Sequence, residues 1–156
     1  MIQLETETPI PAPPERVWSA LVDFASYPKW HPHQAIEGVA QLGGKVRIKG
    51  RLLGSSEFSS NARWTVLRCE SPRLLDLCLG WPLLVRVRQW LEVRPHPRGS
   101  LPVQGTGYEG VVSWLVFRLA LRVERLQPYH DAVARCLTAF LNGSSLPSPV
   151  GENRRQ

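Results

Sequence analysis

The chain opens on a strict alternation of side chains. From residue 2 to residue 10, apolar or β-branched residues hold the even positions, and polar residues or proline hold the odd ones. This period of two predicts a half-buried strand. The spacing then becomes helical over residues 14–25, where Val17, Leu21 and Phe24 share one face. The sequence Tyr-Pro-Lys-Trp-His-Pro at residues 27–32 breaks that helix into a second short turn or helix.

Several alternating segments follow between residues 35 and 114. The clearest covers residues 45–52, where Val46 and Ile48 alternate with lysine and arginine. Segments of this kind predict an antiparallel sheet with one face on a core and the other in water. The same period of two recurs in residues 62–67, 75–79 and 85–93.

The last strand is expected to follow a long turn. Residues 94–107 are rich in proline and glycine, which predicts a turn rather than a strand. A final strand is then expected through Tyr108, Glu109 and Val111. Alternation places Glu109 and Val111 on its inward face.

After Trp114 the period changes from two to nearly four, which indicates an amphipathic helix. Its phase is kept across Pro128, so the pattern predicts one long helix that bends at this proline. Asn142 and Gly143 supply the stop, and residues 143–156 predict a disordered tail after a domain of residues 1–142. The apolar stripe consists of Leu115, Leu119, Val123, Leu126, His130, Val133, Leu137 and Phe140.

Composition adds bounds on this picture. A chain of 156 residues fits one domain with a core of its own. Its three cysteines are odd in number and widely spaced, which argues against a disulfide framework. The start of the chain lacks the pattern of a signal peptide, and the longest apolar run, residues 111–121, is far shorter than the about 20 residues that cross a bilayer. We therefore expect a cytoplasmic protein without a membrane span, either a monomer or a weak homodimer.

The motifs resemble one known family. Residues 11–18, 21–24 and 27–32 are similar to the opening of the polyketide cyclase/dehydrase and lipid-transport family of the START-like (SRPBCC, Bet v 1-like) superfamily. Residues 70–75 resemble its proline-containing turn, and Glu109, Val111 and Ser113 its final strand, although Ser113 stands where glycine is common. The resemblance covers residues 2–142. It implies an α+β helix-grip fold, in which a curved antiparallel sheet wraps around a long C-terminal helix, with two short helices after the first strand.

Such proteins hold a hydrophobic molecule between the sheet and the C-terminal helix. Gln89 and Glu109 fall on otherwise apolar inward faces, where a polar group needs a partner or a ligand. A register that turns either one outward is the alternative. The residues expected to line the ligand site are Trp30, Ile48, Trp64, Leu77, Gln89, Leu91, Glu109, Val111, Leu119, Val123, Leu126 and His130.

Three functions fit these residues. The first is a cofactor-free binder or carrier of a lipid-, polyketide- or quinone-like molecule. The second is a cofactor-independent cyclase, aromatase or dehydratase, in which Glu109, Gln89 or His130 would act on a confined substrate. His31 and His33 lack further ligands at suitable spacing, so no metal site is expected.

The third function is docking of a basic convex face on RNA, a ribosome or an anionic membrane. The net charge is +6, and lysine or arginine recurs outward at residues 45–51 and at Arg86 and Arg88. An ordinary solvated sheet face explains the same pattern, and no aromatic platform accompanies it. We therefore expect no specific binding of nucleic acid.

Overall fold

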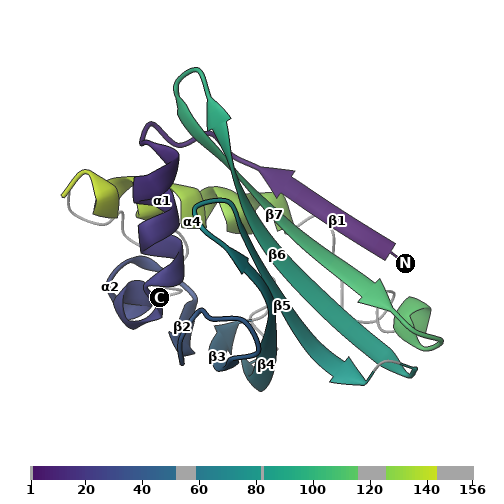
Figure 1. Ribbon diagram of the computed structural model, residues 1–156. Coiled ribbons are helices and arrows are strands. Elements are labelled where there is room, and N and C mark those ends of the chain that lie inside the picture. The colour runs from purple at the N-terminus through teal and green to yellow at the C-terminus, as the bar shows by residue number, and fades with distance from the viewer. Residues whose placement is uncertain (1, 52–58, 82, 116–125, 144–156) are drawn as a thin grey trace, which may run out of the picture.

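A seven-stranded antiparallel sheet forms most of the molecule. The computed structural model describes residues 2–51, 59–81, 83–115 and 126–143, and the strand order is β1-β7-β6-β5-β4-β3-β2 (Figure 1). This arrangement confirms the predicted α+β class. The strands are β1 (Ile2–Glu7), β2 (Gln34–Glu37), β3 (Lys45–Arg51), β4 (Ser59–Glu70), β5 (Leu74–Trp81), β6 (Val85–His96) and β7 (Gly99–Glu109).

Short helices lie between β1 and β2, as the sequence predicts. They are α1 (Pro14–Val22), the 3-10 helix η1 (Phe24–Ser26) and α2 (Tyr27–Trp30). The C-terminal helix, α4 (Leu126–Leu141), contacts α1, α2 and β1 (Figure 1). It ends where predicted, because Gly143 adopts a φ of 67° and its N–H donates to the carbonyl oxygen of Phe140 over 3.2 Å. No helix in the described ranges is long and apolar enough to cross a bilayer.

The core lies between the inward face of the sheet and the helices. Alternation places Val46 and Ile48 of β3 and Trp64 and Val66 of β4 in it, each 3% exposed or less. Leu137 of α4 packs into the same cluster. Full burial of such a side chain stabilises the fold by about 1.5–3 kcal/mol.

The expected long turn at residues 94–107 is wrong. β6 and β7 instead form a continuous hairpin, with His96 paired to Gly99 and Arg86 paired to Glu109. Gly105 and Gly107 of β7 leave room for the ring of Trp90 on β6. A Cβ at Gly105 would lie 1.9 Å from Cε2 of the Trp90 ring, so the ring rests on bare backbone.

The longer strand also changes which side chains point inward. Gln104, Thr106 and Tyr108 face the interior of the sheet, so Glu109 points outward, where it lies 3.7 Å from Arg88. Val111 follows the end of β7 and is 85% exposed. The inward assignments of Glu109 and Val111 are therefore wrong, because a shift of one residue turns a strand's side chains to the other face.

Part of the predicted C-terminal helix falls outside the described residues. Leu119 and Val123 belong to residues 116–125, and so does the predicted continuity of the helix into Pro128. Leu126 begins α4, but its side chain is not among those described. Residues 144–156, the predicted tail, also lie outside.

Candidate functional site

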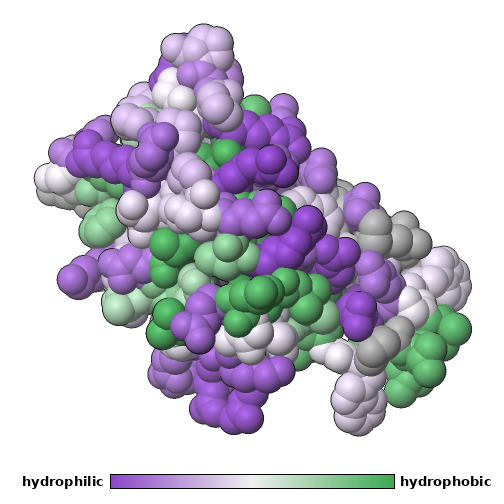
Figure 2. Space-filling view, in the orientation of Figure 1, coloured by the Kyte–Doolittle hydropathy of each residue, from purple (hydrophilic) through white to green (hydrophobic). Residues whose placement is uncertain are grey.

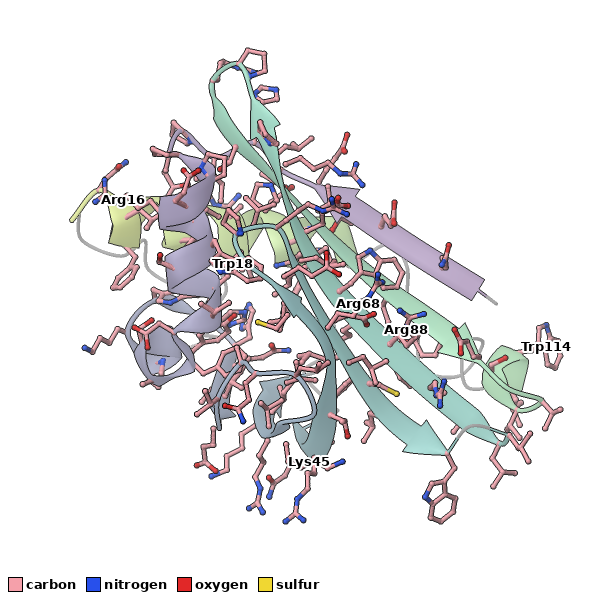
Figure 3. The ribbon with its side chains drawn as sticks, in the orientation of Figure 1. Arg16, Trp18, Lys45, Arg68, Arg88 and Trp114 are labelled. Atoms are coloured by element: carbon pink, nitrogen blue, oxygen red, sulfur yellow. The ribbon has the colours of Figure 1, made fainter. Side chains whose placement is uncertain are left out.

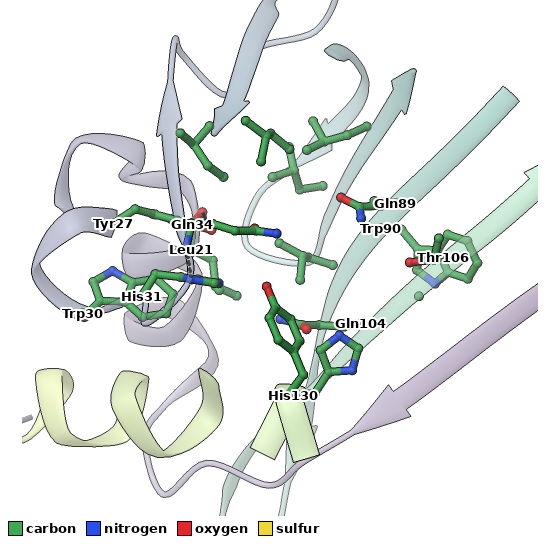
Figure 4. Close-up of a pocket in the computed structure, with 17 residues that line it drawn as sticks. Leu21, Tyr27, Trp30, His31, Gln34, Gln89, Trp90, Gln104, Thr106 and His130 are labelled. Carbon is green, nitrogen blue, oxygen red and sulfur yellow. Dashed lines mark hydrogen bonds between the residues drawn. The ribbon is translucent and has the colours of Figure 1, made fainter. Parts of the chain in front are cut away.

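A pocket of about 70 Å³ opens between the inward face of the sheet, the α2–β2 segment and the beginning of α4 (Figure 4). Eight helices and strands contribute residues to it, from α1 near the N-terminus to α4 near the C-terminus. The lining residues are Leu21, Tyr27, Trp30, His31, Gln34, Ile36, Ile48, Leu75, Leu77, Gln89, Trp90, Leu91, Gln104, Gly105, Thr106, Tyr129 and His130.

Much of this lining is aliphatic or aromatic. Ile48 of β3 and Leu75 and Leu77 of β5 are buried in the core. Leu91 of β6 is only half-buried and packs against that core from its edge. An apolar ligand placed against these side chains would lose contact with water without displacing a charged group.

Polar groups of the sheet form one strip along the pocket. Gln89 of β6 is the direct cross-strand neighbour of Thr106 on β7, and Gln104 lies two residues before Thr106 on the same face. Gln34 reaches toward the pocket from β2, on the opposite side (Figure 4). Amide and hydroxyl groups thus approach the space from both sides.

His31 is fixed by the backbone that follows it. Its Nδ1 accepts hydrogen bonds from the backbone N–H groups of His33 and Gln34, at 3.2 and 3.0 Å. Because Nδ1 accepts, the hydrogen of the neutral ring lies on Nε2. The ring stacks on Tyr27 with centroids 5.4 Å apart. Burial, together with the nearby His33 and His130, lowers the pKa of His31 to about 3.

His130 lies on the first turns of α4 and is hydrogen-bonded to the hydroxyl of Thr6 on β1. Burial lowers its pKa to about 4, against the opposing effect of Asp131. Both pocket histidines are therefore uncharged at neutral pH. A base with so low a pKa accepts a proton poorly near pH 7, where catalytic bases work best with a pKa close to the operating pH.

Tyr129 carries a buried hydroxyl group. The ring stacks against His33 with centroids 5.1 Å apart and meets His130 edge-on. Its Oη has no hydrogen-bond partner within the described part of the chain. Burial raises the pKa of this hydroxyl, so the group remains protonated and able to donate.

The structure brings together half of the residues that the sequence placed at the site. Trp64 faces inward but is packed in the core at 1% exposure and does not line the pocket, which corrects that expectation. Glu109 and Val111 lie outside it, as described above. Those that line the pocket are Trp30, Ile48, Leu77, Gln89, Leu91 and His130.

Sequence reasoning missed several polar groups of the pocket. Gln104 and Thr106 were hidden in the stretch interpreted as a turn. His31 was considered only as a metal ligand. Within the described ranges, no three histidine, cysteine or acidic side chains lie close enough together to hold a metal ion. Tyr129 could have been found, since it lies three residues after Leu126 and four before Val133, on the apolar face of its helix.

The basic residues of the outward face are spread over β3, β4 and β6. The lysine and arginine residues of β3 are separated from Arg86 and Arg88 of β6 by two intervening strands, β4 and β5. Arg88 binds the fully buried carboxylate of Asp76, which Arg68 also contacts (Figure 3). Lys49 is paired with Glu37. Several of these charges are thus already balanced by neighbours.

Apolar side chains gather on the surface where the β5–β6 turn meets the end of β7. Backbone bonds join the two segments, since the N–H of Val112 donates to the carbonyl oxygen of Leu84 over 3.1 Å. Figure 2 shows green surface at this right-hand end, and Figure 3 shows Trp114 pointing away from the sheet. We call this surface the apolar tip, and its residues are Trp81, Leu83, Leu84, Val111, Trp114 and Leu115.

Comparisons with known proteins add a family and a fold. The family model for polyketide cyclase / dehydrase and lipid transport matches residues 1–127. A protein from Rhodobacter sphaeroides is 19% identical with a TM-score of 0.66, over 92% of this chain and 94% of its own. A protein from Mesorhizobium loti is 17% identical with a TM-score of 0.64, over 93% and 100%.

The structure of Ara h 8.0201 is also similar, at 14% identity and a TM-score of 0.62, over 92% of this chain and 99% of its own. At such identities these structures are informative about the fold alone. No curated protein matches the sequence.

Proposed function

Because the chain belongs to the polyketide cyclase/dehydrase and lipid-transport family, we propose that it binds a small, mostly apolar molecule in the pocket between the sheet and α4. The observation that carries this proposal is the lining itself. Aliphatic and aromatic side chains surround the space, and a few amide, hydroxyl and imidazole groups converge on it, as is typical of sites for small ligands.

The size of the pocket limits what enters it. Its 70 Å³ are about half of the roughly 150 Å³ of an engineered apolar cavity that admits benzene. A ring-sized group therefore requires some lining side chains to move apart, and Leu91 is half-buried rather than locked in the core. A ring that buries about 200 Å² gains about 5 kcal/mol, before association costs are subtracted. We expect millimolar affinity for a single ring and tighter binding for larger ligands.

The residues favour binding over catalysis. The carboxylate expected to act on a substrate, Glu109, lies outside the pocket and is paired with arginine. Of the other two candidates, Gln89 is not an acid or base, and His130 is a weak base at neutral pH. Docking through a basic face has less support, because several of the basic side chains are already paired with acidic neighbours.

A pocket-filling variant tests the proposal. Leu91→Trp should occupy the space and weaken binding of ethylbenzene at least tenfold, because the larger side chain competes for the same volume. Leu42→Trp is the matched control, since Leu42 is 73% exposed and remote from the lining. Binding is measured by ligand-observed NMR, and circular dichroism checks that both variants remain folded. Equal binding by the parent and both variants would show that ethylbenzene does not use this pocket.

A further inference from the structure

The hydroxyl of Tyr129 is a buried polar group at the pocket for which the described neighbours provide no hydrogen bond. The side chain is 8% exposed and lines the space, and the described residues offer its Oη no hydrogen-bond partner. A buried hydroxyl without a partner is costly, so such groups normally meet protein, water or ligand. Stacking against His33 and anchorage on α4 hold the ring in place.

Two other aromatic donors of the pocket are already used by the fold. The hydroxyl of Tyr27 donates to the carbonyl oxygen of Leu21 over 2.9 Å. The indole N–H of Trp30 donates to the hydroxyl of Ser26 over 3.3 Å. Tyr129 differs from both, because no described residue accepts a hydrogen bond from its hydroxyl.

The lining also carries no formal charge at neutral pH among the described residues. Within the described part of the chain, it includes no aspartate, glutamate, lysine or arginine. Its two histidines, His31 and His130, are neutral because burial lowers the pKa of each well below 7. A carboxylate or ammonium group would lose its hydration here without meeting an opposite charge, and burial of an unpaired charge is expensive.

We infer that the pocket selects an uncharged ligand with a carbonyl-type oxygen, which accepts a hydrogen bond from Tyr129 Oη. The apolar remainder of the ligand lies against Leu77 and Leu91. This inference rests on the proposed function and deepens it, because it names the class of ligand and the residue that recognises it.

Three probes of nearly the same shape separate these requirements. Acetophenone carries a neutral acceptor, ethylbenzene carries none, and benzoate carries a charge. Each is titrated by ligand-observed NMR at pH 7 into the parent, Tyr129→Phe and Tyr108→Phe. Tyr108 is the control, since its side chain is buried on β7 but does not line the pocket. Thermal unfolding of each variant checks that the fold is intact.

We expect the parent to bind acetophenone at least tenfold more tightly than benzoate. Tyr129→Phe should weaken acetophenone about 2- to 12-fold, the range of one net hydrogen bond, and leave ethylbenzene equal or tighter. Tyr108→Phe should change neither. Unchanged affinity of acetophenone in Tyr129→Phe would overturn the assigned role.

Comparable binding of benzoate and acetophenone by the parent would overturn the selection against charge, even if a variant failed to fold. Both outcomes leave the proposed pocket in place, provided that ethylbenzene binds. If none of the three probes binds to the parent, the proposed function fails together with the inference.

Discussion

At the scale of single residues, His31 joins the fold to the pocket. Its Nδ1 closes the turn between α2 and β2 by accepting two backbone N–H groups, while its ring lines the ligand space. A protonated ring would lose Nδ1 as an acceptor and place a charge among apolar side chains. The same imidazole therefore contributes to stability and keeps the pocket neutral.

The first prediction concerns the stability of the fold in acid. The pKa of His31 is lowered from its ordinary value near 6.5 to about 3 in the folded chain. Between these two pH values the unfolded state binds more protons at this residue than the folded state does. The contribution of His31 to the free energy of unfolding is therefore complete above pH 6.5 and decreases as the pH falls toward 3. In His31→Asn the side-chain oxygen replaces Nδ1 as acceptor without titrating. Near pH 5 this variant should take up about one proton fewer on unfolding than the parent.

The measurement is urea unfolding at several pH values between 4 and 7. His96→Asn is a matched control, because the Nδ1 of His96 also accepts a backbone N–H two residues later, but at an exposed turn. The control should keep the pH dependence of the parent. An equal slope in all three chains would show that His31 is not held neutral by burial.

At the scale of elements, the β6–β7 hairpin decides which side chains reach the pocket. The ring of Trp90 lies over Gly105 on the outward face. In the same register of β6 and β7, the side chains of Gln104 and Thr106 point inward. The register of one hairpin thus supplies the polar strip of the site. It also sends Glu109 to the arginines outside.

The second prediction tests this contact. A Cβ at Gly105 would lie 1.9 Å from the Trp90 ring, whereas one at Gly107 would lie 3.3 Å from it. Gly105→Ala should therefore destabilise the fold by about 1–3 kcal/mol, as overpacking usually does, and Gly107→Ala by clearly less. Urea unfolding at pH 7 measures both, and equal losses would contradict the packing of Trp90 over Gly105.

The elements differ in how well the sequence predicts them. The sequence alone was sufficient to predict β3, from its strict alternation, and the end of α4, from Gly143. Both features depend on neighbours along the chain. The strand over residues 99–109 was not predicted, since Gly105 and Gly107 are explained only by Trp90 on the facing strand. Glu109 and Trp64 show the same limit at the site. Side-chain direction depends on register, and the boundary between lining and core depends on packing that alternation does not contain.

At the scale of the whole molecule, two apolar surfaces compete for a hydrophobic probe. One is the pocket, enclosed by the sheet and α4 and supplied with polar groups. The other is the apolar tip, where Leu83 and Val111 are 84% and 85% exposed. Exposed apolar patches often mark interaction sites, so binding of a probe is informative only when its location is known.

The location of binding is the most direct test of the proposed function. The ¹⁵N-labelled chain is titrated with acetophenone, and amide shifts are followed by two-dimensional NMR. We predict that the largest shifts occur at Gln34, Gln89, Thr106 and Tyr129, with little change at the apolar tip. Shifts centred on the tip, with the amides of the pocket unmoved, would contradict this prediction.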